Sequence, residues 1–82
     1  MSQQFTQQIK TRMSVLVFLK GAAAPLVLYV EEPQNLYLEL VSYLGMTTNK
    51  IIEKETSGPI KKVSFCSAQI NAVAMQEEQY FQ

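Results

Sequence analysis

The chain has 82 residues, of which 48% are hydrophobic, and its seven lysines and arginines balance seven glutamates. A single domain of this size buries barely enough core, and association with further copies often supplies the remainder. A net charge of zero argues against a protein that is held mainly by phosphate groups, so nucleic acid is not the expected partner. Without histidine or aspartate, and with one cysteine, the chain cannot assemble the common zinc or calcium sites or an internal disulfide. We therefore expect a cytoplasmic protein without a cofactor.

The N-terminal residues, MSQQFTQQIK, are rich in glutamine and show no apolar period that would bury one face. Such a composition is typical of a flexible segment. We predict a flexible arm over residues 1–10, followed by one domain over residues 11–78.

The densest apolar stretch, SVLVFLKGAAAPLVLYVEEP, consists of two runs, Val15–Leu19 and Leu26–Val30, on either side of Gly21 and Pro25. A membrane helix would place Lys20 near the middle of the bilayer, and a secretion signal would be interrupted by the same lysine. Two short apolar runs around a turn instead predict a β-hairpin. Because neither run alternates, we expect both faces to be covered, one by a helix and the other by another subunit.

The segment EEPQNLYLELVSYLG predicts the one helix of the chain, with Pro33 at its first position and Gly45 as its C-terminal cap. Its apolar residues recur with helical spacing and form a stripe that one small sheet would not cover completely. We therefore predict a homo-oligomer, or another protein partner, that contacts the exposed part of this stripe. The candidate interface residues are Leu36, Tyr37, Leu40, Tyr43 and Leu44.

Three further segments have strand character, namely KIIEKET (50–56), IKKVSFC (60–66) and INAVAMQ (70–76). Simple alternation in the last of them places Ile70, Ala72 and Ala74 on one face of the strand. The resulting order is strand, strand, helix, strand, strand, strand. It predicts an α+β fold, a small antiparallel sheet with one amphipathic helix packed on one face.

Residues for catalysis are scarce. General acid–base chemistry would have to use glutamates. Two adjacent pairs are present, Glu31–Glu32 and Glu77–Glu78, and on a strand the two members of each pair would point to opposite faces. Cys66 has no histidine to activate it and fits a small buried apolar residue better than a nucleophile. We expect no catalytic residue and no metal site, and we interpret the chain as a non-enzymatic binding or assembly module.

An alternative interpretation uses the lysines. Lys20, Lys61 and Lys62, with backbone amides near GAAAP and SGP, would hold a nucleotide or another small anion between subunits. The competing explanation is that edge lysines only prevent sheets from pairing with one another.

Several short motifs resemble a family of short, functionally uncharacterised cyanobacterial proteins, over roughly residues 14–78. These are LKG…PL (Leu19, Lys20, Gly21, Pro25, Leu26), LY (Leu36, Tyr37), Glu53, and KKVSF…INAV (residues 61–65 and 70–73). The resemblance implies a cytoplasmic single-domain protein without assigned activity, and it brings no catalytic residues.

The last six residues, EEQYFQ, fit the pattern Glu-x-x-Tyr-x-Gln, which resembles the recognition site of a plant-virus protease used to remove affinity tags. We interpret residues 79–82 as a tail outside the domain. Whether this tail is native or the remnant of a tag remains open at this point.

Overall fold

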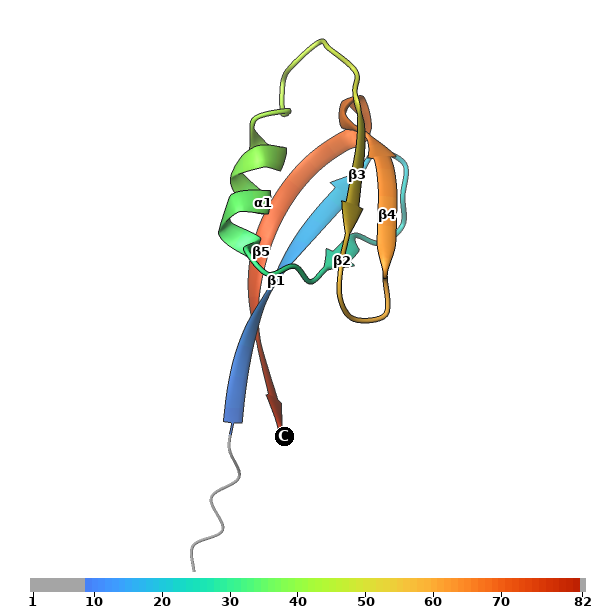
Figure 1. The fold of residues 1–82 in the computed structure, drawn as a ribbon. Coiled ribbons are helices and arrows are strands. Elements are labelled where there is room, and N and C mark those ends of the chain that lie inside the picture. Colours follow the sequence, from blue (N-terminus) through green and yellow to red (C-terminus); the bar gives the residue numbers. More distant parts are fainter. Residues whose placement is uncertain (1–8, 82) are drawn as a thin grey trace, which may run out of the picture.

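The computed structural model describes residues 9–81 and has the predicted α+β architecture (Figure 1). Its elements, in chain order, are β1 (Ile9–Leu19), β2 (Leu26–Leu28), α1 (Pro33–Val41), β3 (Ile51–Glu55), β4 (Lys62–Cys66), the 3₁₀ turn η1 (Ser67–Gln69) and β5 (Ile70–Phe81). The order ββαβββ is thereby confirmed. The last two residues of the predicted arm belong to β1, and the rest of the arm lies outside the described residues.

The first sheet has the strand order β2–β1–β5, and all its pairings are antiparallel. The predicted hairpin is confirmed, because β2 pairs with β1 from Val15↔Leu28 to Val17↔Leu26. Gly21 lies in the connection with a φ of 78°, a backbone conformation that favours glycine. β1 thus lies in the middle of this sheet, between β2, the next strand along the chain, and β5, the last described strand.

β3 and β4 form a separate two-stranded sheet instead of extending the first one. Among residues 9–81, one bridge joins the two sheets, between Tyr29, just after β2, and Ser57, shortly after β3. The Ser57 N–H donates to the Tyr29 carbonyl at 2.7 Å. The single sheet expected from the sequence is divided because β2 has only three residues and leaves little edge to pair with β3.

Helix α1 begins at Pro33, as predicted, and its last α-helical residue is Val41. It ends before Gly45 because the N–H groups of Tyr43 and Leu44 bond to carbonyls three residues earlier, which tightens the last turn. Gly45 closes this turn with a φ of 80°. Within residues 9–81, no helix is both long and apolar enough to cross a membrane.

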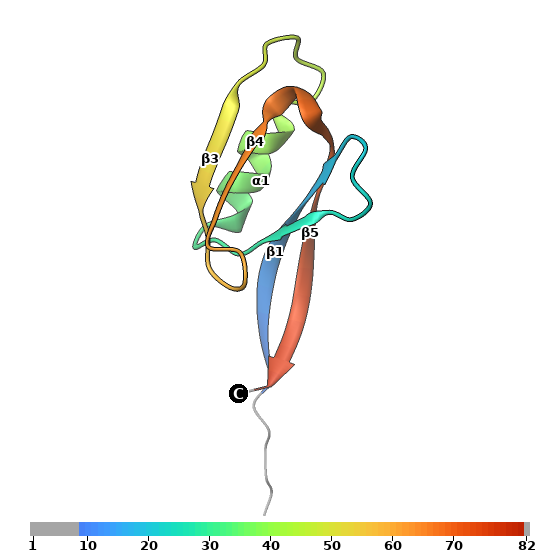
Figure 2. The ribbon, with the colours of Figure 1, turned by 90° about the vertical axis from the view of Figure 1, so that its right-hand side faces the viewer.

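The core lies between the first sheet, the β3–β4 hairpin and α1 (Figure 2). We call the side of the first sheet that carries Val15 and Val17 its core face, and the side that carries Ser14 its outer face. The buried apolar side chains are Val15, Val17, Leu28, Leu36, Leu40, Ile52, Phe65 and Ile70. All three layers contribute to this list, so no layer forms the core alone.

Strand β5 contains an irregularity that the sequence pattern does not reveal. Leu19 pairs with Ile70 but Phe18 pairs with Ala72, so one residue of β5 is left over between them. An extra residue changes which face the following side chains take. Ile70 therefore packs in the core together with Val73, whereas Ala72 is exposed. Simple alternation would instead place Ile70 and Ala72 on the same face of the strand.

The ends of β1 and β5 extend beyond the core as a two-stranded ribbon, in which residues 9–13 pair with residues 77–81 (Figures 1 and 2). β2 pairs only with Val15, Leu16 and Val17 and therefore does not reach this part of β1. Residues 79–81, predicted to be a tail, form part of β5 because β1 provides them with a pairing partner. Gln82 lies outside the described residues.

Replacing Leu40 with alanine tests the core. Leu40 is completely buried, so removing its methyl groups leaves a cavity, and we expect a loss of about 2–5 kcal/mol in the free energy of unfolding. Leu38→Ala on the same helix is the matched control, because Leu38 is 55% exposed. Urea denaturation followed by circular dichroism measures both. Equal losses for the two variants would contradict the described packing of α1.

Candidate functional site

The most highly connected polar group is the Glu78 carboxylate on the outer face of the first sheet. Its Oε2 accepts hydrogen bonds from the Ser14 hydroxyl at 2.9 Å and from the Tyr29 hydroxyl at 2.8 Å. Arg12, the cross-strand partner of Glu78, places Nη2 3.5 Å from Oε1. We call Arg12, Ser14, Tyr29 and Glu78 the Glu78 cluster; it ties β5 to β1 and to the end of β2.

These bonds determine the protonation states of the Glu78 cluster. The hydrogen bonds from Tyr29 and Ser14, with the nearby Arg12 charge, lower the pKa of Glu78 below its ordinary value. The same hydrogen bond raises the pKa of Tyr29, because the hydroxyl proton is held by the carboxylate. Near neutral pH, Glu78 is therefore ionised and Tyr29 is neutral. A carboxylate with a lowered pKa is a weak base, poorly suited to removing a proton from a substrate.

The Tyr29 ring is enclosed on two sides. The Arg12 guanidinium carbon lies 4.1 Å from the ring centroid, a distance typical of a cation–π contact. Gly58 also lies close to the ring, and a Cβ added there would be 2.8 Å from Tyr29 Cδ2. The backbone bridge between Tyr29 and Ser57 fixes this approach. Tyr29 therefore holds the two sheets together through both its backbone and its ring.

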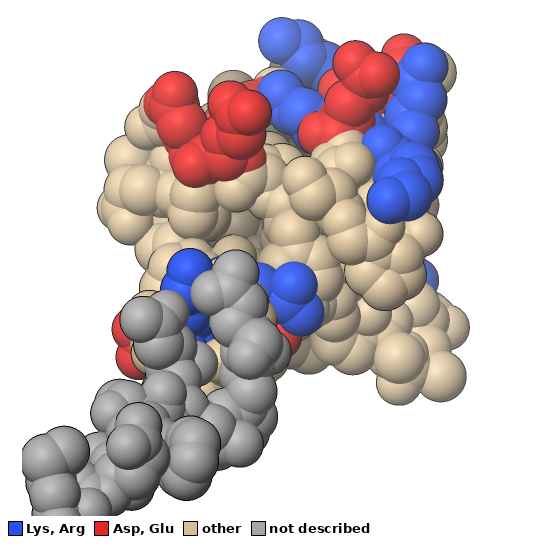
Figure 3. Space-filling model, turned by 60° about the horizontal axis from the view of Figure 1, so that its bottom comes forward, with Lys and Arg blue, Asp and Glu red and all other residues tan. Residues whose placement is uncertain are grey.

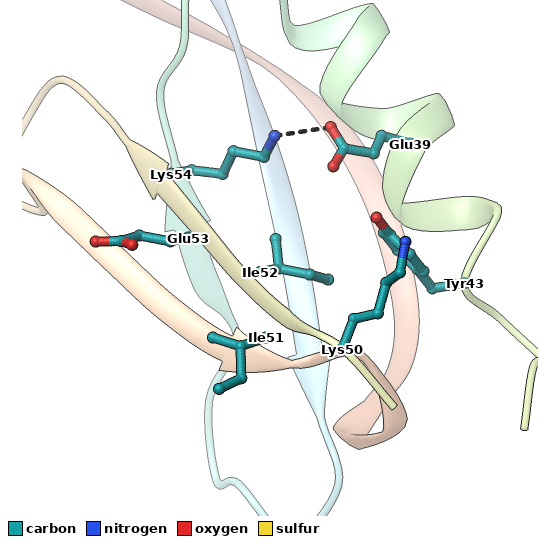
Figure 4. A pocket seen from close by; sticks show the side chains of 7 residues that line it. All are labelled: Glu39, Tyr43, Lys50, Ile51, Ile52, Glu53 and Lys54. Atoms are coloured by element: carbon teal, nitrogen blue, oxygen red, sulfur yellow. Dashed lines mark hydrogen bonds and ion pairs between the residues drawn. The ribbon is translucent and has the colours of Figure 1, made fainter. Parts of the chain in front are cut away.

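A second polar arrangement lines a shallow groove of about 430 Å³ between α1 and β3 (Figure 4). Lys54 on β3 points across the groove to Glu39 on α1, with 2.9 Å between Nζ and Oε1. Lys50 lies beside Tyr43, with Nζ 5.9 Å from the ring centroid. The lining contains two lysines, Lys50 and Lys54, and two glutamates, Glu39 and Glu53, so the groove lacks the excess positive charge that an anion site needs.

The structure separates the five candidate interface residues into two groups. Leu36 and Leu40 are buried in the core of the chain itself, so they are not accessible to a partner in the folded protein. Tyr37 and Tyr43 are half-buried, and Leu44 is exposed. The helix residue that the sequence prediction omitted is Leu38, which is exposed. Its signal in the sequence was an apolar side chain in the otherwise polar row Gln34, Leu38, Ser42.

The three lysines of the anion prediction are not brought together. Lys20 follows β1 and donates its backbone N–H to Gln69, which lies beyond the C-terminal end of β4. Lys61 and Lys62 lie at the opposite end of β4, and Lys62 pairs with Glu53 at 3.3 Å. Figure 3 likewise shows basic and acidic side chains interspersed at one corner of the molecule. An anion site formed by all three lysines would need a second copy of the chain.

Other reactive groups are isolated from one another. Cys66, at the end of β4, is half-buried and lies opposite Ile51 on the neighbouring strand. Within residues 9–81, no three cysteine and glutamate side chains converge as metal ligands would.

Comparison with known proteins finds no matching family model, no matching curated protein and no matching solved structure. The resemblance to short cyanobacterial proteins stays a prediction from the motifs.

Replacing Gly58 with alanine tests the contact between the sheets. Gly58 has a φ of 82°, and a Cβ there would meet the Tyr29 ring, so both backbone strain and a clash oppose the change. Gly21→Ala is the matched control, because Gly21 has a φ of 78° but open space around it. The backbone term costs about 1–2 kcal/mol at either site. In thermal melting, Gly58→Ala should be clearly less stable than Gly21→Ala; equal stability would argue against the described Tyr29 packing.

The lowered pKa of Glu78 predicts an acid-sensitive contribution to stability. Protonation is less favourable in the folded chain than in the unfolded chain. The contribution is therefore present above the ordinary glutamate pKa and is lost as the pH falls through the folded value. Glu78→Gln should reduce stability at pH 7 and flatten its decline on acidification, as followed by urea denaturation between pH 7 and 3. Glu55→Gln is the control, and an unchanged decline in Glu78→Gln would contradict the described cluster.

Proposed function

We propose that this chain is a small binding and assembly module that acts through protein–protein contacts, including contacts with further copies of itself, and that it is not an enzyme. The proposal is carried by one observation: large apolar side chains remain exposed outside the core. Four of them come from one stretch of chain that includes α1 and the connection to β3, namely Leu38, Leu44, Met46 and Ile51.

The degree of exposure supports this proposal. Ile51 is 79% exposed on the outer side of β3, and Leu38 is 55% exposed on α1. Single exposed apolar residues are normal, whereas contiguous exposed apolar surface is typical of a contact site, and these four residues lie close together in the sequence. In a chain of 82 residues, contact with a second subunit also adds buried area that one core of this size cannot supply.

The polar groups support a non-catalytic role. The Glu78 carboxylate is occupied by donors from Ser14, Tyr29 and Arg12, and these stabilise its ionised form. The groove between α1 and β3 is bridged by the Lys54–Glu39 ion pair. In both places the charged groups satisfy one another, which favours structural support over turnover of a substrate.

Light scattering coupled to size-exclusion chromatography tests the proposal. At micromolar concentration we expect a mass that is a multiple of the 9.3 kDa chain. The double variant Leu38→Glu with Leu44→Glu should fold normally, because both residues are exposed, and should weaken assembly. Leu36→Ala is the contrasting variant: it should lower the melting temperature because Leu36 is buried.

A wild-type chain that keeps the mass of one copy up to high micromolar concentration, and that binds no protein, would overturn this proposal.

A further inference from the structure

The ribbon at the end of the first sheet has no neighbour on either edge within the described residues. It consists of residues 9–13 of β1 and residues 77–81 of β5, and β2 pairs with neither segment. An isolated two-stranded ribbon is marginally stable in water, and a third strand or a packed helix is generally needed. Ile9 is 57% exposed on this ribbon, and Tyr80 is exposed on the other strand.

The two strands of the ribbon carry opposite charges. The β1 segment contains Lys10 and Arg12 and no acidic residue, and the β5 segment contains Glu77 and Glu78 and no basic residue. Pairing two β1 edges, or two β5 edges, would therefore bring like charges together. Arg12 and Glu78 already pair within one chain, which leaves Lys10 on β1 and Glu77 on β5 for a partner. Pairing a β1 edge with a β5 edge brings these two opposite charges together, which favours that choice of partner.

The β1 edge also has room for another strand. Beside it, next to the residues that follow β2, lies a hollow of about 480 Å³. Its lining includes apolar surface from Met13, Val30 and Pro33. The charged residues of the lining are Arg12, Glu31 and Glu77. An added strand would thus gain both backbone hydrogen bonds and apolar contact at this position.

We propose that a second copy of this chain adds the end of its β5 to the β1 edge of the ribbon, so that the first sheet continues from one subunit to the next. β2 already occupies the β1 edge at residues 15–17, so the added strand runs parallel to β1, which directs the remainder of its β5 away from β2. Because the two contacting surfaces differ, the interface is head-to-tail. Its repetition gives a closed ring if the rotations from one subunit to the next add up to a full turn. This inference rests on the proposed assembly function and adds a second contact, separate from the exposed apolar residues of α1 and the connection to β3.

Two edge variants of the full chain test the proposal. In variant A, Lys10→Glu with Thr11→Glu makes the β1 edge acidic; in variant B, Glu77→Lys with Gln79→Lys makes the β5 edge basic. Each should show about a tenfold or greater rise in the dissociation constant of self-assembly, measured by analytical ultracentrifugation. An equimolar mixture should assemble again, because A keeps an intact β5 edge and B keeps an intact β1 edge.

Two further measurements make the test specific. Lys20→Glu changes the charge in the same direction as variant A but lies in the turn after β1, so it should assemble like the wild type. Thermal melting of each variant checks that the fold is retained. In the wild type, amide hydrogens of residues 77–81 should exchange more slowly as protein concentration rises.

The outcomes separate this inference from the proposed function. If the wild type assembles and both A and B assemble equally well, or if the mixture of A and B stays monomeric, the ribbon interface is wrong while the assembly function stands. If Leu38→Glu with Leu44→Glu then disrupts assembly, the contact lies on α1 instead. A wild type without any self-association overturns the ribbon interface directly.

Discussion

The pairing of β1 with β5 is the interaction on which the rest of the structure depends. It joins the first described strand to the last, from Ile9↔Phe81 to Leu19↔Ile70, and both β2 and α1 contact this pair. The core face of the pair receives α1 and contributes Val15 and Val17 to the core. Its outer face carries the Glu78 cluster, and its far end forms the ribbon. One long antiparallel pair therefore determines the core, the polar cluster and the exposed edges.

Tyr29 is the second essential connection, because the two sheets have no other shared bridge in the described part of the chain. Its carbonyl accepts a hydrogen bond from Ser57, its ring packs against Gly58, and its hydroxyl donates to Glu78. Tyr29 thus connects the β3–β4 hairpin to both β1 and β5. The Glu78 cluster, through Tyr29, therefore supports the fold by joining these elements.

The sequence predicted the helix and the strands well. It predicted less well which of them pack together and in which register. Pro33, Gly21 and the uninterrupted apolar runs are local signals, so the start of α1 and the β1–β2 hairpin could be inferred from them. The extra residue between Ile70 and Ala72 could not, because it depends on the register with β1, a strand from the other end of the chain. The Glu78 cluster was missed for the same reason. The helix stripe indicated that apolar surface is available, but only the packing showed that Leu36 and Leu40 are used internally and that Leu38 is exposed.

The long separation of β1 and β5 along the chain also limits how this protein can fold. Ser14 and Glu78, which share a hydrogen bond, are 64 positions apart, so a large loop must close before their strands can pair. The β3–β4 hairpin and α1 need only local contacts and can form earlier. During synthesis, the apolar β1 must therefore wait without its main partner until the last strand has left the ribosome. Over that interval one edge of this apolar strand stays unpaired, and exposed apolar surface with unpaired strand edges makes a folding intermediate prone to aggregation.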